Sequence, residues 1–352
     1  MKLKQFLNKV FAFCATILFF CILYVLAIYL LLFVPNFTRN DPTEEQNKVH
    51  FFTEENYARY ESERVWFWNQ RPDTISIESF DGLKLVAYTL KSEIEPKGTV
   101  LLMHGHHSDP IREFTGIARF YHESGYNIVL PFQRTHGASE GKYITFGVKE
   151  SRDLLEWTRK INEIYGEEKP LFLHGISMGC ATVLMSLSFN LPQNVRAVVA
   201  DCGFTSPQAI IYKTLTHDKK IPTANLVIKV GDFFARILAG FSFNEKSTLD
   251  AIEVNKKREN QIPILFIHGG ADETVPLDMS GENFMRAEGS FVQVHGAGAE
   301  FMPNKQADKY LFVQIADAPH AISFLVDEKK YSTTVSTFLS KYGIQNQKSE
   351  EK

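Results

Sequence analysis

Three side chains whose types cooperate in acyl transfer, Ser177, Asp272 and His320, lie at or just beyond the ends of apolar runs. A serine hydroxyl is a weak nucleophile until a base removes its proton, and that base needs an acid partner that fixes its tautomer. The chain supplies the nucleophile first, then the acid, then the base. We therefore expect a hydroxyl that attacks a carbonyl carbon and forms a covalent acyl intermediate.

The residues around Ser177 indicate a sharp turn between a strand and a helix. An apolar run of strand length precedes the turn, and the run from Cys180 to Leu187 is long enough for a helix. Gly175 and Gly179 lack the Cβ atoms that would collide with neighbouring strands, so the turn can lift the hydroxyl clear of the sheet. The alternative is an ordinary turn whose serine only caps the helix. The acid and base downstream favour the nucleophile.

The candidate acid and base follow two later apolar strands. Asp272 comes just after one strand, and His320 comes just after the next. Asp201 also ends a strand and is the main alternative acid, while Glu273 and Asp317 are further candidates. His320 is the expected base, and the alternative is a solvated loop histidine.

Several segments together resemble the motifs of one known superfamily. They are Gly175-Ile-Ser-Met-Gly179, His104-Gly105 at a strand end, Arg134-Thr-His-Gly-Ala-Ser-Glu-Gly141, His268-Gly269 with Asp272 and Val275-Pro276, and the late His320. Over residues 73–342 the chain resembles a serine hydrolase of the α/β-hydrolase superfamily, closest to bacterial membrane-anchored, esterase-like members. The order serine, acid, histidine agrees with that superfamily. One departure is Phe132, where many relatives carry an aspartate, and it concerns how the following loop is anchored.

The resemblance implies an α/β fold with a mainly parallel eight-stranded sheet, helices on both faces and a small helical lid. It implies cleavage of a small-molecule carboxylic ester or other acyl substrate through an acyl-enzyme on Ser177, with His320 as base, Asp272 as its partner and no cofactor. A peptidase or amidase of the same fold is an alternative. So is a binding protein of this fold that has lost catalysis, because fold alone does not establish function.

The tetrahedral intermediate places negative charge on the former carbonyl oxygen, so main-chain N–H groups should meet it. One expected donor is Met178, which directly follows the nucleophile at the start of a helix. The resemblance assigns the second donor to His106. The side chains of His106 and His107 could then shape the pocket.

The run His104, His106 and His107 also suggests a metal site, but the strand end already explains these residues. No Cys-x-x-Cys or His-Glu-x-x-His pattern accompanies them, and no glycine-rich phosphate loop occurs. The net charge is -3 and the pI is about 6.4. We therefore expect no metal, and no nucleic acid as a partner.

Strands and helices alternate along the chain, which predicts a sheet covered on both faces with its active site at the carboxyl ends of the strands. The turn Asp81-Gly82 predicts a hairpin at the start of this sheet. Strands are expected at 74–80, 83–90, 98–103, 126–131, 171–173, 195–200, 264–268 and 310–315, and helices at 111–122, 148–164, 180–187, 281–288 and 329–341.

The insert 205–260 is expected to form the lid. Its apolar residues recur at steps of three and four, which gives a helix a broad apolar face; they are Leu226, Val230, Phe233, Phe234, Ile237, Leu238 and Phe241. This face either lines the substrate site, with Phe234 and Ile237 in contact with an apolar acyl group, or packs as ordinary core.

The segment from Val10 to Val34 carries no charge and would form a helix of about 37 Å, enough to cross a bilayer. Lys2, Lys4 and Lys9 precede it, so the positive-inside rule places residues 1–9 in the cytoplasm and the main domain outside the cell. A cleaved signal peptide is the alternative, but the end of the apolar run offers no small residues. The bilayer is thus an expected partner, through a transmembrane helix at 10–34.

Residues 35–72 are expected to be a juxtamembrane stalk, and 343–352 a disordered tail after the hydrolase domain at 73–342. A helix from Glu54 to Trp68 would bring Tyr57, Tyr60, Val65 and Trp68 to similar faces. We expect it to pack on the domain. The alternative is that Trp66 and Trp68 rest in the lipid interface.

The chain has four cysteines, too few for a disulfide framework. Cys14 and Cys21 lie in the predicted membrane span. Cys180 and Cys202 lie near the ends of neighbouring predicted strands, where a bridge is conceivable. Two buried thiols that pack as small apolar residues are the favoured interpretation.

Overall fold

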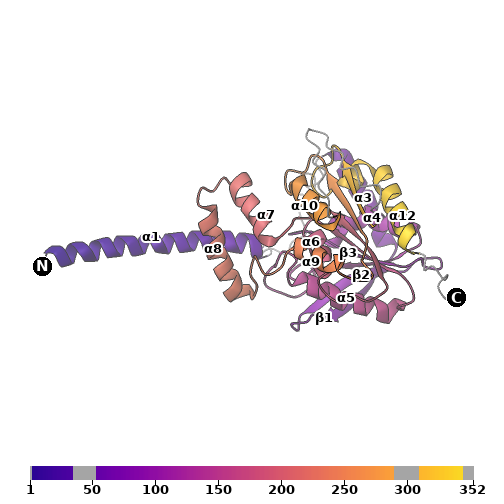
Figure 1. Cartoon of the computed structure of the whole chain (residues 1–352), viewed down its shortest axis with the longest axis horizontal. Coiled ribbons are helices and arrows are strands. Elements are labelled where there is room, and N and C mark those ends of the chain that lie inside the picture. Colours follow the sequence, from indigo (N-terminus) through magenta and orange to yellow (C-terminus); the bar gives the residue numbers. More distant parts are fainter. Residues whose placement is uncertain (1, 35–52, 289–308, 344–352) are drawn as a thin grey trace.

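The computed structural model describes residues 2–34, 53–288 and 309–343 of the chain, and its centre is one eight-stranded sheet (Figure 1). The strand order is β1-β2-β4-β3-β5-β6-β7-β8. The strands are β1 (Asp73–Glu78), β2 (Lys84–Leu90), β3 (Thr99–Met103), β4 (Asn127–Pro131), β5 (Leu171–Ile176), β6 (Val195–Asp201), β7 (Ile264–Gly269) and β8 (Tyr310–Ile315). The predicted eight-stranded α/β fold is therefore confirmed.

The sheet begins with the predicted hairpin and continues in parallel. β2 pairs antiparallel with both β1 and β4, and the other neighbouring strands are parallel. In the turn, the N–H of Gly82 donates to the Ser79 carbonyl at 3.0 Å, and Gly82 has a φ of 84°, which glycine adopts without strain. The parallel strands bring their carboxyl ends to one edge of the sheet.

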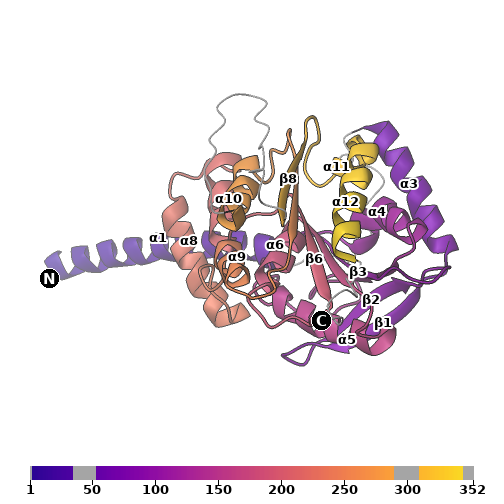
Figure 2. The same ribbon diagram turned by 45° about the vertical axis from the view of Figure 1, so that its right-hand side comes forward.

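Helices cover both faces, as Figure 2 shows, where the sheet separates α9 and α10 from α12, α4 and α3. One face is covered by α5 (Glu150–Tyr165), α6 (Met178–Ser186), α9 (Thr248–Lys256) and α10 (Leu277–Glu288), and the other by α3 (Glu54–Asn69), α4 (Pro110–Glu123), α11 (Ser323–Val326) and α12 (Glu328–Gly343).

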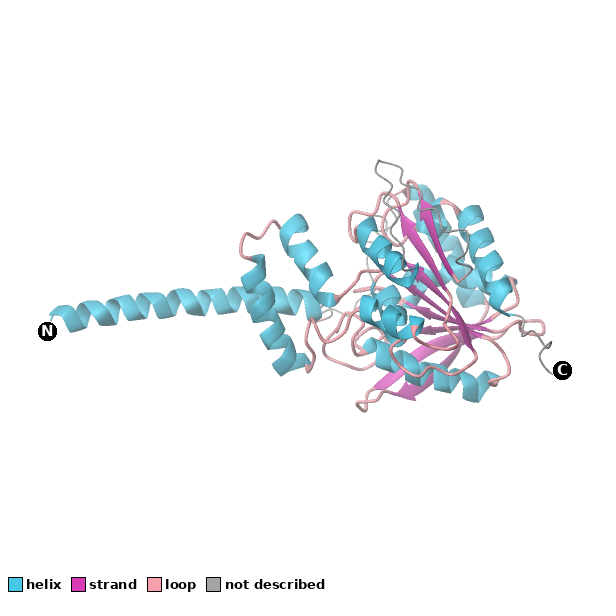
Figure 3. Cartoon of the chain, in the orientation of Figure 1, coloured by secondary structure: helices cyan, strands magenta, loops and turns pink. Residues whose placement is uncertain are grey.

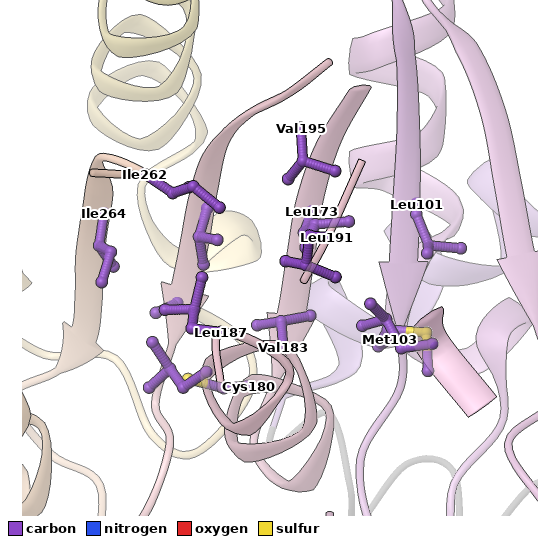
Figure 4. Close-up of a cluster of buried hydrophobic side chains, with 14 of the residues drawn as sticks. Leu101, Met103, Leu173, Cys180, Val183, Leu187, Leu191, Val195, Ile262 and Ile264 are labelled. Carbon is purple, nitrogen blue, oxygen red and sulfur yellow. The ribbon is translucent and has the colours of Figure 1, made fainter. Parts of the chain in front are cut away.

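Alternate residues of each strand enter the two cores. Leu101 and Met103 of β3 pack with Val183 of α6 (Figure 4), whereas Val100 and Leu102 point into the opposite core. This alternation follows from the period of two in a strand, and it explains why the central strands are apolar throughout.

The stalk helix α3 packs on the domain, as expected, but with a different face. Tyr60 and Phe67 are its buried residues, while Val65 is 54% exposed. Trp66 lies against the His122 ring, and Trp68 lies against Tyr88. Residues 35–52 of the expected stalk, and 344–352 of the expected tail, fall outside the described residues.

The N-terminal apolar segment forms one long helix, α1 (Lys2–Phe33), which starts eight residues before the predicted span. Its stretch Leu3–Tyr24 has a mean hydropathy of 2.2, and none of its residues is buried. In the described part of the chain this is the one helix long and apolar enough to cross a membrane. At its end, Phe33 is buried, stacks on Phe243 and accepts a hydrogen bond from the Ile144 N–H at 2.8 Å.

The lid insert contains two helices that each end in a π-helical turn: α7 (Pro207–Lys213) with η1 (Thr214–Asp218), and α8 (Ala224–Phe234) with η2 (Ala235–Ala239). Lid residues, Phe33 and Met178 share one apolar cluster. The lid therefore connects the end of α1 to the residue that follows Ser177. Helix α9, also within the insert, packs instead on α6 and α10.

Candidate active site

Ser177 sits on the predicted sharp turn between β5 and α6. Its φ of 56° and ψ of -117° are unusual for a residue with a Cβ atom. A Cβ on Gly179 would overlap the Met103 carbonyl, and one on Gly175 would overlap the carbonyl of Gly179. Both glycines are therefore required for β3, β5 and α6 to approach closely enough to hold this turn.

The structure brings Ser177, His320 and Asp272 into one hydrogen-bonded chain. His320 Nε2 lies 2.9 Å from Ser177 Oγ, and His320 Nδ1 lies 2.6 Å from Asp272 Oδ2. A neutral imidazole with its proton on Nδ1 satisfies both contacts, because Nδ1–H donates to the carboxylate and Nε2 accepts from the hydroxyl. This is the arrangement in which an imidazole can remove the serine proton.

Asp272 is held as a buried carboxylate. Its Oδ1 accepts from the N–H groups of Thr274 and Val275, both at 2.9 Å, and its Oδ2 faces His268 as well as His320. Burial opposes ionisation, but the hydrogen bonds from His268 and His320 outweigh it and hold the pKa of Asp272 well below its ordinary value. The carboxylate is therefore charged at neutral pH and fixes the orientation of His320.

The alternative acids do not reach His320. Asp201 is buried at the end of β6 and accepts instead from the Tyr331 hydroxyl at 2.8 Å. Burial raises the pKa of Asp201 to about 6. Glu273 and Asp317 are exposed on their loops.

The loop after β3 is fixed by its buried histidine. The N–H of Gln133 donates to His104 Nε2 at 3.0 Å, which leaves Nδ1–H to donate to the Gly105 carbonyl at 2.8 Å. Burial lowers the pKa of His104 to about 4, in keeping with a neutral ring. The Gln133 amide also donates to the His104 carbonyl and accepts from Thr182 of α6. This network ties the loop to the helix that follows Ser177.

Sequence reasoning missed Glu113, in the first turn of α4. Its Oε2 accepts from the Gly105 N–H at 2.6 Å, and a Cβ on Gly105 would lie near both this carboxyl and Ser177 Cβ. Burial raises the pKa of Glu113 to about 7. The sequence signal was limited to an acidic residue four positions after Asp109, which caps α4.

Phe132 departs from the superfamily pattern, and the loop after it is anchored by ion pairs. Arg134 donates to Asp153 at 2.7 and 2.6 Å and to Asp81 twice at 3.1 Å. The Phe132 ring covers Gly137, at the tip of that loop. The departure thus leaves the loop anchored and does not touch Ser177, Asp272 or His320.

Comparison with known proteins gives one consistent result. The family described as "Serine aminopeptidase, S33" matches residues 94–252, somewhat less than half of the chain. The uncharacterized protein YqkD of Bacillus subtilis (strain 168) is 23% identical over 274 residues, which cover 74% of this chain and 81% of that protein. The Pyrococcus furiosus esterase Pf2001 aligns with a TM-score of 0.56 and 22% identity over 78% of this chain and 93% of its own.

The chain has the α/β-hydrolase fold. A second solved structure, the acylaminoacyl peptidase of Pyrococcus horikoshii, aligns with a TM-score of 0.50 and 17% identity over 80% of this chain and 42% of its own. Identities this low show the fold alone. The chemistry and substrate of this chain must therefore be argued from its own site.

The two expected oxyanion donors come from the start of α6 and from the loop after β3. Met178 begins α6, so its N–H is among those without an acceptor inside the helix. His106 follows Gly105 in the loop that Glu113 and His104 hold, and its ring stacks on Phe146. The roles of both main-chain groups stay predictions.

The three side chains predicted to contact substrate have different positions in the structure. The ring of His107 lies 4.1 Å from that of His106, beside the site. Phe234 packs partly buried against the lid cluster that contains Met178. Ile237 is 63% exposed on the surface of the lid, so here it does not line a pocket. The apolar pattern of α8 could not distinguish a face turned inward from one turned outward.

Among the described residues, one group could hold a metal ion by geometry: Cys202, Asp272 and His320. Burial and nearby Asp201 raise the pKa of the Cys202 thiol well above its ordinary value, and His320 already contacts two partners. The chemistry of a protonated thiol fits a metal poorly. Cys180 and Cys202 are both buried free thiols, as favoured from the sequence.

Proposed function

We propose that this chain is a membrane-anchored serine hydrolase that cleaves carboxylic esters, with Ser177 as nucleophile, His320 as base and Asp272 as its partner. The observation that carries the proposal is the hydrogen-bonded chain from Ser177 Oγ through His320 to Asp272 Oδ2, at 2.9 and 2.6 Å. The strained turn at Ser177 supports it further, because backbone strain of this kind clusters at active sites, and the nucleophile of this fold sits on such a turn.

In the proposed reaction, His320 Nε2 takes the proton of Ser177 as Oγ bonds to the ester carbonyl carbon. The negative charge that appears on the carbonyl oxygen is met by the N–H groups of Met178 and His106. His320 then returns the proton to the departing alkoxide as the ester C–O bond breaks. Water next attacks the acyl-enzyme, His320 takes its proton, and the acid product leaves with Ser177 restored.

An apolar acyl group is favoured by the surroundings of Ser177. Met178 packs in one cluster with Phe146, Phe204, Val275 and residues of the lid. Met178 and the three other named side chains are buried. Such a wall can receive hydrocarbon but offers little to hold a charged peptide terminus. Ester cleavage is therefore preferred over peptide cleavage, although both neighbours with printed activities share this fold.

Anchoring is proposed from α1, whose exposed stretch Leu3–Tyr24 has the length and hydropathy of a membrane span. The lysines at positions 2, 4 and 9 favour a cytoplasmic N-terminus and a catalytic domain outside the cell. A signal peptide is removed after export, so its C-terminal residues would not be expected to pack in the core of the domain. Phe33 instead packs in the lid cluster, which supports a retained anchor.

The proposal is tested with the full chain in nanodiscs, assayed on p-nitrophenyl esters of increasing acyl length and on a panel of short aminoacyl peptides. We expect ester turnover that Ser177→Ala abolishes. Ser188→Ala serves as the matched control, because Ser188 lies just beyond α6 and bonds only to the Met185 carbonyl. Cleavage of peptides without esters would assign a peptidase, and no turnover of either would leave a binding protein.

A further inference from the structure

The outer surface of the lid carries a row of exposed apolar side chains. Leu226, Phe233 and Ile237 are 61%, 58% and 63% exposed, and half-buried Val230 lies between them. Their spacing of four, three and four residues places them on one face of the helix formed by α8 and η2. We call these four residues the lid stripe. Exposed apolar surface of this kind marks an interaction site.

The lid stripe lies beside the proposed membrane anchor. Helix α1 contacts α8, and Phe33 shares a buried cluster with Val227 and Ile228 on the other face of α8. Figures 1 and 3 show α8 lying across α1 instead of along it. If α1 spans the bilayer, then α8, which lies across α1, is roughly parallel to the membrane surface.

The depth of the lid follows from the exposed length of α1. With Lys9 at the cytoplasmic interface, the exposed stretch Val10–Tyr24 has 15 residues, which at about 1.5 Å per residue span about 22 Å, less than the hydrocarbon thickness of about 30 Å. Burial by the domain begins only beyond it, with half-buried Leu26 and buried Phe33. The lid thus begins at the level of the outer leaflet.

Charge also fits a lipid surface. From Lys213 to Arg236 the lid has five basic and two acidic residues, although the whole chain has a net charge of -3. Lys213 and Arg236 pair with the two acidic residues, and the other three, Lys219, Lys220 and Lys229, are exposed. A helix with an exposed apolar row and basic neighbours is the type that lies in the interface of a membrane containing anionic lipids.

We propose that the lid stripe docks into the outer leaflet of the bilayer, so that the site of Ser177 faces the membrane and receives an ester that resides in the lipid. This inference rests on the anchor and the hydrolase chemistry proposed above. The cluster that the lid shares with Met178 places the lid between the bilayer and the nucleophile. An acyl chain could then pass from the leaflet to Ser177 without entering water.

Docking is tested with an environment-sensitive fluorophore on single cysteines of the full chain, in nanodiscs of phosphatidylcholine and phosphatidylglycerol that contain doxyl-labelled lipid. Three proteins are compared: native Cys14 with Cys21→Ser, and Phe233→Cys or Val254→Cys, each with Cys14→Ser and Cys21→Ser. Cys180 and Cys202 are buried and should not react. Val254 on α9 is the matched control, since it is exposed and apolar but lies on a helix that packs on α6 and α10.

We expect a blue shift and doxyl quenching at positions 14 and 233, and neither at position 254. Quenching at 14 without quenching at 233 would overturn docking and leave the anchor. Absence of quenching at 14 would overturn both. A blue shift at 233 that grows with protein concentration, without doxyl quenching, would instead assign the stripe to contact with a second copy. None of these readouts depends on catalysis.

The link to substrate is tested by Leu226→Ser, Phe233→Ser and Ile237→Ser combined, with Val254→Ser as control. We expect hydrolysis of a long-chain ester embedded in the nanodisc to fall about tenfold or more, and hydrolysis of a soluble acetyl ester to stay within about twofold. Equal losses on both esters would count against a membrane-borne substrate. Quenching at 233 without any ester hydrolysis would refute the proposed chemistry but not the docking.

Discussion

At the scale of single residues, position in the fold assigns different tasks to chemically similar groups. Asp272 and Asp201 both lie at the carboxyl ends of parallel strands of one sheet, yet only Asp272 contacts His320. Asp272 accepts two main-chain hydrogen bonds and its pKa falls, whereas burial raises the pKa of Asp201. A strand-end carboxylate is therefore insufficient evidence for the acid unless the geometry of the following loop is known.

The first prediction separates these two carboxyls. Asp272→Asn should lower kcat for ester hydrolysis by about a thousandfold or more, because His320 loses the partner that fixes its tautomer. Asp201→Asn should keep kcat within about threefold, since an amide oxygen can still accept from Tyr331. Steady-state kinetics of both variants on one ester decide this. A larger loss for Asp201→Asn would reverse the assignment of the acid.

The second prediction concerns pH and Glu113, whose pKa is raised from 4.5 to about 7 by burial. A folded state that raises the pKa of an acid binds more protons than the unfolded chain, so stability falls as pH rises from about 4.5 to about 7. Glu113→Gln removes this loss and can still accept from the Gly105 N–H. Its Tm relative to the parent should therefore rise between pH 5 and pH 8.

The control for this measurement is Glu123→Gln, at the exposed C-terminal end of the same helix. Its Tm difference from the parent should change little over the same range. If Glu113→Gln behaves like Glu123→Gln at every pH, Glu113 is not a carboxyl that titrates in this buried position.

Much of the site was predictable at this scale, because Ser177, Asp272 and His320 each come with a local pattern in the sequence. Glu113 was not, since its role depends on the direction in which α4 points its first turn toward the loop after β3. His106 and Met178 remain predictions as oxyanion donors. A main-chain role leaves no requirement on the side chain that a sequence could reveal.

At the scale of elements, close packing around the turn at Ser177 explains which glycines cannot change. Gly179→Ala should destabilise the fold by about 3 kcal/mol or more, because its Cβ would overlap the Met103 carbonyl, a main-chain atom that cannot move aside cheaply. Gly231→Ala in α8 is the control. Its Cβ would meet only Phe243 at an ordinary 3.5 Å, and alanine favours a helix by about 0.5–1 kcal/mol. Urea unfolding of both variants tests the contrast.

Strands and sheet-covering helices could be predicted because each has a clear period and turn signals at its ends. Helix α10 nevertheless starts at Leu277, directly after Pro276, four residues before the predicted start. On α3, the expected grouping of Val65 with Tyr60 was wrong, because the helix packs through Tyr60 and Phe67. The helix has low amphipathicity, so the sequence does not indicate which of its faces is buried.

At the scale of the whole molecule, the ends of the N-terminal region lie on different sides of the domain. Helix α1 meets the lid, whereas α3 packs against α4 on the side away from α1 (Figures 1 and 2). Trp66 and Trp68 are therefore placed against the domain and not near the proposed membrane level. Hydropathy alone predicts neither the placement of α1 and α3 on different sides of the domain nor the burial of Phe33, since both depend on tertiary contacts.

The fourth prediction tests the anchor itself. Leu18→Arg with Ile22→Arg places two charges in the exposed part of α1, each costing about 2.5–3.5 kcal/mol in a membrane span. We expect this double variant to leave the membrane pellet during a carbonate wash. Leu18→Ala with Ile22→Ala should stay in the pellet. If both variants remain, α1 does not hold the protein in the bilayer.

The central claim is that Ser177 is activated by His320, and covalent labelling measures this most directly. The full chain in nanodiscs is treated with a fluorophosphonate, and the modified peptide is identified by mass spectrometry. We predict one adduct, on Ser177, that forms about a thousandfold more slowly in His320→Ala. An adduct on another serine, or labelling at Ser177 that does not depend on His320, would contradict the account.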